Sequence, residues 1–586
     1  MSNGKNITIS IIIFLGILIA VISVLTLKYT FQFFQDLTLQ NQQDYNTLHL
    51  CLSGSYPEAP TFDPWSFLSD RRSLTVEDLI QSINKASYDN DIDQIFITLY
   101  PVDIGWARIS ELRECLQDFK SSGKPIYVYM ENAGDKEYYL ASVADSIYLS
   151  PTGQLTVDGL SATVFFYKNL MNKLGIDWEV FKAGDFKSAP EIFTDTAMSE
   201  QYRASITQLL TETVEFYLTE VNQTREKQFL VPFKQILSQG PYLSANKAYH
   251  YRLVDQLDTK QNIMTQHQFQ GYCIQPRDYL FSRWTDVPPP KSIALIFVEG
   301  EIFTGENAYS PFGLITGSRT ISQAIIDASL NPEIKAIVLR INSPGGDINA
   351  AYEIGKAVEL ASQKKPVVAS MSDMAASGGY FVAMYADLIV ANQFTLTGSI
   401  GAFLMKPNLE NLLIKIGVTV DTVNTHPHSN FMPLYRDLTE KEKEIINNSL
   451  LEAYNLFITE VARCRDLDSA YVDSVAQGRV WSGYQAYNLH LVDTLGGLDL
   501  SIKLARDLAE IPIDQSVGIM LYPEMEFNFK KLNTYIHTYT DLSKILAGFV
   551  HPDYTGVMDV SLRELLSSAQ LQTKIKYIQP DLIWIE

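Results

Sequence analysis

Stretches of apolar residues that suit buried strands alternate along this chain with stretches that suit helices. A polar start followed by a run rich in Ile, Val and Leu is typical of a buried strand. It occurs after Asp91 (DIDQIFITLYPVD) and again after Pro332 (PEIKAIVLRINSPGGD). Helix-like stretches follow at 106–121 and at 350–362. Because strands and helices alternate, we expect an α/β fold with right-handed crossovers and a largely parallel sheet.

The same order of elements occurs twice along the chain. Asp145 and Asp387 occupy matching places 242 residues apart, and 244–257 (SANKAYHYRLVDQL) matches 482–495 (SGYQAYNLHLVDTL) at an offset of 238 residues. An offset that stays nearly constant across many elements indicates a duplicated unit. We therefore predict a tandem duplication of one α/β domain.

The predicted repeats cover 45–285 and 293–510, and the proline-rich segment 286–292 (DVPPPKS) is the predicted linker between them. The length of 586 residues agrees with two large domains, because it is too long for one ordinary core. Beyond residue 510 the pattern fades into a C-terminal extension, 511–586, to which the sequence assigns no fold.

The amino-terminal segment is apolar for long enough to cross a membrane. Residues 7–28 contain few polar side chains, and about 20 residues at a rise of about 1.5 Å span the hydrocarbon core. A cleaved signal peptide has a shorter apolar region and a cleavage site of small residues, whereas LKYTF follows here at 27–31. We expect an uncleaved transmembrane anchor at 7–28 after a short tip at 1–6. Its orientation stays open, because Lys5 and Lys28 place one lysine on each side.

The composition excludes some classes of partner. The formal net charge is −21 and no run of basic residues appears, so nucleic acid is not an expected partner. The four cysteines are widely spaced and form no CxxC pair, which excludes the usual zinc and thioredoxin-like spacings. We expect no metal and no cofactor.

Three short motifs follow successive predicted strands of the second repeat: SPGG at 343–346, MAASGGY at 374–380 and LTGSIG at 396–401. Glycines at the end of a strand let the backbone turn and expose its N–H groups. Ser377 is flanked by small residues at a strand-to-helix junction, which gives a substrate access to its hydroxyl. This is the logic of a nucleophile elbow, although G-x-S-x-G is absent. Each motif alone is also typical of an ordinary turn, but the three in this order are specific.

In this order and spacing the motifs resemble those of the signal peptide peptidase A family, peptidase family S49 of the Clp/crotonase superfamily. The anchor, the duplication and the length resemble the long two-repeat bacterial form of that family. The resemblance implies Clp/crotonase-like domains in a membrane-bound serine endopeptidase that degrades cleaved signal peptides and other short hydrophobic peptides. It also implies a homo-oligomer, expected to be a tetramer, on the periplasmic side of the bacterial inner membrane.

The predicted repeats differ at the positions where a catalytic pair is expected. Serine needs a base, because its hydroxyl is a poor nucleophile at neutral pH. At the offset of 242 residues, Ser377 matches Asp135 of the first repeat, and Lys187 of the first repeat matches Ser429 of the second. Each repeat thus lacks half of a Ser/Lys pair, which predicts one site shared by both. The segment GDFKSA also resembles the family's general-base segment, which implies that Lys187 is the base.

The proposed base must be neutral near pH 7, although a free lysine has a pKa of about 10.4. Burial between two domains lowers a lysine pKa, and the apolar residues around Lys187 suit such a site. The resemblance further implies that the N–H groups of Gly346 and Gly378 form an oxyanion hole, with Gly345 as a possible substitute. It implies that Ser399 orients the lysine amine.

Several alternatives stay open at this point. A crotonase-type acyl-CoA enzyme shares the fold, but it does not explain the Ser/Lys complementarity or the anchor. A membrane scaffold with decayed sites would not need the intact motifs. A serine protease could instead use His428 as the base, within the second repeat, or Lys182 in place of Lys187.

Overall fold

The computed structural model describes residues 45–60, 74–267, 269, 273–282, 291–310, 313–512, 515, 517–523 and 584–585. The predicted tip and anchor lie outside these residues, as do most of the predicted linker and of the C-terminal extension. Within the described ranges, no helix combines the length and the apolar character needed to cross a bilayer. The anchor and the boundaries of the two repeats therefore stay predictions.

A six-stranded sheet, in which every neighbouring pair of strands is parallel, forms the first repeat. In spatial order its strands are β7 (Gln256–Leu257), β4 (Ser146–Thr156), β3 (Ile126–Gly134), β2 (Gln94–Asp103), β1 (Thr47–Ser55) and β8 (Cys273–Ile274). The central strands are apolar on both sides: Ile95, Phe96 and Ile97 in succession are buried. Such runs are expected where both faces of a parallel sheet are covered.

The second repeat has a sheet of the same order. It contains β19 (Thr494–Leu495), β15 (Leu388–Ala391), β14 (Val367–Ala376), β13 (Ala336–Ser343), β9 (Lys291–Glu299) and β20 (Gly518–Tyr522), all in parallel pairs. Two further strands extend this sheet. β16 (Leu396–Gly398) pairs parallel with β14, and β18 (Val480–Ser482) pairs antiparallel with β16. The matching order of both sheets agrees with the predicted α/β fold and its duplication.

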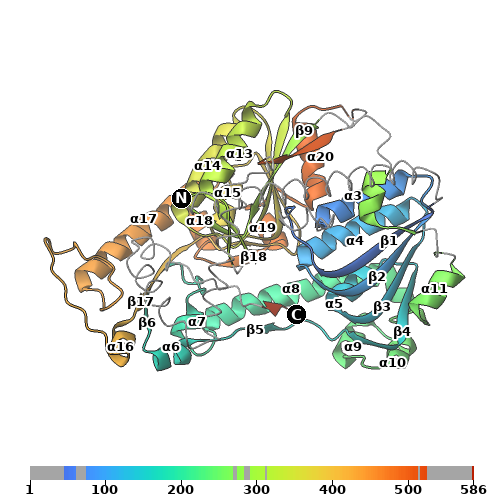
Figure 1. Ribbon diagram of the computed structural model, residues 1–586, viewed down its shortest axis with the longest axis horizontal. Helices are drawn as coiled ribbons and strands as arrows, with labels where there is room; N and C mark the ends of the chain where they lie inside the picture. The colour runs from blue at the N-terminus through green and yellow to red at the C-terminus, as the bar shows by residue number, and fades with distance from the viewer. Residues whose placement is uncertain are drawn as a thin grey trace, which may run out of the picture.

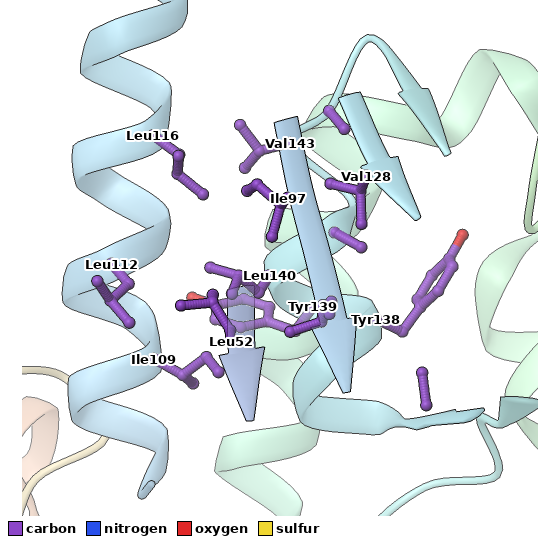
Figure 2. Close-up of a cluster of buried hydrophobic side chains, with 14 of the residues drawn as sticks. Leu52, Ile97, Ile109, Leu112, Leu116, Val128, Tyr138, Tyr139, Leu140 and Val143 are labelled. Atoms are coloured by element: carbon purple, nitrogen blue, oxygen red, sulfur yellow. The ribbon is translucent and has the colours of Figure 1, made fainter. Parts of the chain in front are cut away.

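Helices cover both faces of each sheet. On the first sheet these are α3 (Val76–Tyr88), α4 (Trp106–Ser121) and α5 (Asp135–Ala141) on one face and α11 (Lys260–Gln266) on the other. On the second sheet they are α13 (Ser318–Leu330), α14 (Ile348–Ser362) and α15 (Gly378–Ala383), with α20 (Leu498–Leu508) opposite. Figure 2 shows Ile109, Leu112 and Leu116 of α4 pointing toward the strands, because residues at this spacing share one face of a helix.

Further elements complete the described fold. In the first repeat they are β5 (Ala162–Thr163), η1 (Glu226–Gln228), α9 (Phe233–Gln239), α10 (Ala245–His250) and α12 (Pro276–Ser282). In the second repeat they are β10 (Glu301–Phe303), β11 (Ala308–Ser310), β12 (Gly313–Gly317), α16 (Glu410–Lys415), α17 (Glu440–Arg465), α18 (Ser469–Val475) and α19 (Gly483–Asn488). β21 (Trp584–Ile585) pairs antiparallel with β5.

A long arm of the first repeat reaches the second repeat. It contains α6 (Lys168–Leu174), β6 (Asp177–Ala183), α7 (Glu191–Thr194) and α8 (Glu200–Arg225). β6 does not join the first sheet; it pairs antiparallel with β17 (Ala402–Asn408) of the second repeat. In Figure 1 these two strands lie side by side, away from the first sheet, and α8 leads back toward that sheet. The loop that follows β6 is thereby carried to the second repeat.

Buried charges join the two repeats. Arg340 of β13 is 1% exposed, and its guanidinium donates two hydrogen bonds of 2.9 Å to Glu111 of α4. It also donates to Glu58 over 3.1 Å. Breaking such a buried pair leaves a charge without compensation, which makes the contact between the repeats sensitive to single substitutions.

A half-buried carboxylate holds the strand that leads to Ser377. Asp373 of β14 accepts hydrogen bonds from the backbone N–H groups of Gly105 and Ala107, each over 3.1 Å, and from the side chain of Arg108. These N–H groups belong to the first turn of α4, where a carboxylate is favourable. The amino end of α4 in the first repeat is thus attached to β14 of the second repeat.

Candidate active site

Ser377 lies between β14 and α15 with φ of 53° and ψ of −114°. A positive φ is rare for a residue other than glycine, and strained backbone of this kind concentrates at functional sites. The Ser377 N–H donates to the Gly398 carbonyl over 2.8 Å, which attaches the turn to β16. The sequence prediction of a serine on a sharp strand-to-helix turn agrees with this geometry.

Lys187 follows β6 in the arm of the first repeat and is 5% exposed. Its Nζ lies 3.1 Å from Ser377 Oγ, although 190 residues separate the two in sequence. Nζ also lies 2.8 Å from Ser399 Oγ and 2.9 Å from the Ser399 carbonyl oxygen. The fold therefore brings together, within one chain, the three side chains that the sequence singled out.

Burial lowers the pKa of Lys187 from its ordinary 10.5 to about 7. The amine is therefore much closer to neutrality near pH 7 than a free lysine is. A neutral amine has two hydrogens and one lone pair. The two Ser399 oxygens accept the hydrogens, which leaves the lone pair for the hydroxyl hydrogen of Ser377. The three distances thus suit an amine that accepts a proton from Ser377.

Ser399 owes its position to a turn after β16. Its φ is 51°, and its N–H donates to the Arg479 carbonyl over 2.7 Å. This conformation turns both its hydroxyl and its carbonyl oxygen toward Lys187. The predicted contact between Ser399 and the lysine amine is present, whereas its effect on catalysis stays a prediction.

Two backbone N–H groups lie close together beside Ser377. A Cβ added to Gly378 would lie 3.1 Å from the Gly346 nitrogen, so these residues are neighbours in space. The Gly345 N–H already donates to Ser343 Oγ over 3.1 Å, which removes it as a free donor. Gly346 has φ of 153°, and a Cβ there would lie 2.1 Å from the Ile302 carbonyl oxygen. The geometry favours Gly346 and Gly378 over Gly345 as donors to a substrate oxygen.

Comparison with protein families identifies the chain. The sequence model of peptidase family S49 matches residues 118–270 and 359–512, once in each repeat. The Clp protease model matches residues 315–391. The chain belongs to peptidase family S49.

Curated relatives of this S49 peptidase cover most of its length. It is 36% identical over 465 residues to Protease 4 of Salmonella typhi, which spans 76% of this chain and 74% of the relative. Protease 4 of Haemophilus influenzae is 31% identical over 469 residues, or 76% and 75% of the two chains. The chloroplastic serine protease SPPA of Arabidopsis thaliana is 30% identical over 458 residues, or 76% and 68%. The chain is a serine protease with two repeats.

Two apolar cavities of this S49 peptidase meet at Ser377. One, of about 340 Å³, is lined by Ser377, Gly346 and apolar side chains that include Phe381, Phe431, Leu450 and Phe457. The other, of about 210 Å³, is lined by Ser377, Lys187 and side chains that include Tyr202, Ile206 and Val480. Ser377 therefore lies between two pockets that suit apolar side chains.

The alternative bases lie elsewhere. Lys182 is exposed on β6, and His428 is exposed in the segment after α16. Neither lines a cavity beside Ser377. Among the described residues, the amine of Lys187 is the side-chain group within hydrogen-bond distance of Ser377 Oγ. The geometry thus favours Lys187 over both alternatives.

Sequence reasoning missed one part of the site, the turn at 476–479 before β18. Its backbone contacts both Phe186, next to Lys187, and Ser399. A signal was present in the repeat itself, because Gln239-Gly240 of the first repeat matches Gln477-Gly478 of the second at the offset of 238 residues. A dipeptide retained in both copies marks a turn that the fold needs.

Proposed function

We propose that this protein is a membrane-anchored serine endopeptidase in which Ser377 is the nucleophile and Lys187 is the general base. The observation that carries the proposal is the distance of 3.1 Å between Lys187 Nζ and Ser377 Oγ. Burial also lowers the pKa of Lys187 to about 7, which suits an amine that acts as a base near neutral pH. Ser/Lys pairs of this kind replace the histidine of the serine-protease triad. Membership in peptidase family S49 supports the same chemistry.

The first half of the reaction forms an acyl-enzyme. Ser377 Oγ attacks the carbonyl carbon of the scissile peptide bond while its proton passes to the neutral Lys187 amine. The carbonyl oxygen becomes an oxyanion that accepts hydrogen bonds from the Gly346 and Gly378 N–H groups. When the C–N bond breaks, the Lys187 ammonium returns the proton to the leaving amine. The acyl group remains as an ester on Ser377.

The second half of the reaction releases the acid. A water molecule takes the place of the departed amine and attacks the ester carbonyl, and Lys187 accepts one of its protons. The same two N–H groups receive the second oxyanion. Collapse of this intermediate returns the proton to Ser377 Oγ. Both halves use Lys187 alternately as base and acid, so no metal or cofactor is required.

The proposed substrates are short hydrophobic peptides, such as the fragments left when signal peptides are cleaved. The two cavities beside Ser377 support this class, because their walls are mainly apolar and their volumes of about 340 and 210 Å³ suit large side chains. Burying such a side chain contributes roughly 1.5–3 kcal/mol to binding. We expect peptides with Leu or Phe near the cut bond to be cleaved faster than peptides with Asp or Lys there.

Four variants test the proposed pair. Ser377→Ala and Lys187→Ala are expected to abolish hydrolysis of a fluorogenic hydrophobic peptide, whereas Lys182→Ala, on the neighbouring strand, and His428→Ala retain it. Activity in Lys187→Ala together with loss in His428→Ala would contradict the pair. Circular dichroism of each variant shows whether it is folded.

Two further assays address the other functions that the fold allows. A serine-reactive phosphonate is expected to label Ser377 in the folded protein; failure to label it would favour a scaffold without activity. Acyl-CoA turnover without peptide hydrolysis would instead favour a crotonase-type enzyme.

The apolar sequence at 7–28 is long enough to span the hydrocarbon core of a membrane. We propose that this segment anchors the protein in the bacterial inner membrane, with the catalytic domains on the periplasmic side. The protein should then remain in the membrane fraction after a high-salt wash. Protease added to spheroplasts should digest the catalytic domains; their protection would contradict the proposed orientation.

We also propose a homo-oligomer, a tetramer by resemblance to the family. The pairing of β6 with β17 joins the first repeat to the second. Because the domain is duplicated, each of these two strands has a corresponding segment in the other repeat. The segment that corresponds to β6 is 419–425, in the part of the chain where Val418, Val420 and Val423 are 43%, 47% and 96% exposed. Three exposed valines within six residues suit a contact with the segment around β5 of another copy.

The oligomer can be tested in detergent. Light scattering of the purified full-length protein is expected to give four copies per particle, and Val420→Asp is expected to lower that number. Lys415→Asp, at the exposed end of α16, is a control for added charge near the same surface. A monomeric wild-type protein that is fully active would contradict the proposed assembly.

A further inference from the structure

The turn at 476–479 of the second repeat makes three backbone hydrogen bonds to the parts of the site around it. The Gln477 carbonyl accepts the N–H of Phe186 over 2.8 Å. The Arg479 carbonyl accepts the N–H of Ser399 over 2.7 Å, and the Gly478 N–H donates to the Ile400 carbonyl over 2.7 Å. One turn is therefore bonded both to the lysine segment of the first repeat and to the segment that orients the lysine amine.

The contact between this turn and Lys187 is too close for a side chain. Gly478 has φ of 75°, and a Cβ on it would lie 2.7 Å from Lys187 Cβ. From the other side, Gly184 has φ of 112°, and a Cβ on it would lie 2.5 Å from the Gln477 carbonyl carbon. Two glycines thus let the backbone of the turn form one wall of the lysine site.

The side chain of Gln477 fixes the turn. Its Nε2 donates to Asp473 Oδ1 of α18 over 2.8 Å and to the Tyr454 hydroxyl of α17 over 3.1 Å. The Tyr454 hydroxyl donates to the same Asp473 oxygen over 2.5 Å. Gln477 has φ of 51°, so these bonds hold a backbone conformation that a free chain rarely adopts.

We propose that Gln477 is a positioning residue for Lys187, which keeps the turn at 476–479 closed against the lysine and so excludes water from it. This inference depends on the proposed Ser/Lys mechanism, in which Lys187 is the base that Gln477 would keep in place. Tyr202 and Glu301 are the other ionisable groups lining the cavity beside Lys187, and Arg479 lies over the Phe186 ring. The pKa of Lys187 is lowered by burial, so its value depends on the wall staying closed.

The experiment measures kcat/KM against pH for the full-length protein in detergent, with a fluorogenic hydrophobic peptide. Gln477→Ala should admit water and raise the pKa of Lys187. If it rises by about one unit, kcat/KM falls about five-fold at pH 7 and by less than about 10% at pH 9, since the amine is then neutral in both proteins. In the pH profile, the acid limb is the fall of kcat/KM toward low pH. Tyr454→Phe is a milder change and should move this limb toward higher pH by less than Gln477→Ala does.

Two variants are matched controls. Asp473→Asn keeps the Oδ1 acceptor and should retain the wild-type profile, whereas Asp473→Ala should behave like Gln477→Ala. Gln239→Ala alters the same turn in the first repeat, where Val157 takes the place of Ser399, and should leave the profile unchanged.

The outcomes separate this inference from the mechanism that it depends on. An acid limb that stays in place in Gln477→Ala and Tyr454→Phe, or an equal loss of activity at every pH, would overturn the positioning role. An active Lys187→Ala protein, or a wild-type profile without an acid limb, would overturn the Ser/Lys mechanism itself.

Discussion

Replacing Lys187 by Met is expected to inactivate the enzyme and to make the folded protein more stable below pH 7. Burial lowers the pKa of Lys187 from 10.5 to about 7, so the folded protein binds a proton there less tightly than the unfolded chain does. Since one pKa unit corresponds to about 1.36 kcal/mol, the buried lysine destabilises the folded state by roughly 5 kcal/mol below pH 7. Met has a similar length and no charge to desolvate.

The pH window follows from the sign of the shift. Between pH 7 and 10.5 the unfolded chain binds more protons than the folded one, so the stability of the wild-type protein rises with pH relative to the variant. The advantage of Met is fully present below pH 7 and disappears above pH 10.5. Met leaves the Ser399 carbonyl without its donor, which costs about 1–3 kcal/mol at every pH. The expected net gain at pH 6 is therefore roughly 2–4 kcal/mol.

The assay compares midpoints of thermal unfolding at pH 6 and pH 9.5 for the full-length protein in detergent. The advantage of Lys187→Met should shrink by about 3 kcal/mol between these pH values, which amounts to several degrees in Tm. Lys182→Met is the control, because it makes the same substitution at an exposed position on the neighbouring strand. Two results would refute the claim that burial lowers the pKa of Lys187 to about 7. One is a variant that is less stable than the wild type at pH 6, and the other is a difference in Tm between the two proteins that does not change with pH.

Three further substitutions test other contacts. Ser399→Ala removes one of the two oxygens that orient the amine and should lower kcat roughly 10²-fold while KM changes little, as steady-state kinetics would show. Gly346→Ala places a Cβ 2.1 Å from a carbonyl oxygen and should displace an oxyanion donor, with a loss in kcat of roughly 10²–10³-fold. Arg340→Ala leaves the buried Glu111 without its cation and removes from Glu58 the nearer of its two arginines, the other being Arg108. It should destabilise the protein by about 3–5 kcal/mol in urea unfolding, against less than about 1 kcal/mol for the exposed Arg319→Ala.

Much of the fold, and the choice of Ser377 and Lys187 as candidate residues, could be predicted because the duplication is visible in the sequence. The helix-like stretch 106–121 corresponds to α4, Trp106–Ser121, and 350–362 lies within α14, Ile348–Ser362. Aligning the chain with itself placed Ser377 opposite Asp135 without any structure. The register of β3 and β14 agrees with that alignment, because Ala133 pairs with Leu155 as Ala375 pairs with Thr397.

The contacts between the repeats could not be predicted in the same way. The sequence of β6 suits a strand. Nothing local indicates that it pairs with β17, whose partner residues lie 219 to 231 positions further on, instead of joining the first sheet. The pairing of Arg340 with Glu58 and Glu111 likewise joins residues 282 and 229 positions apart. Such contacts depend on how the two folded repeats pack against each other. The periodicity of apolar residues along the chain carries no information about this packing.

In the first repeat, different side chains occupy the place that corresponds to the Ser377 turn of the second repeat. In the first repeat, Asp135 stands where the second has Ser377, and its carboxylate accepts the Gly159 N–H over 3.2 Å. Trp106 and Tyr139 occupy the neighbouring space, and Phe394 of the second repeat packs on both, with ring centroids 5.6 and 5.9 Å away. Phe394 lies five residues before Ser399. An aromatic cluster in the first repeat thus packs against the segment of the second repeat that leads to Ser399, the residue in contact with the Lys187 amine.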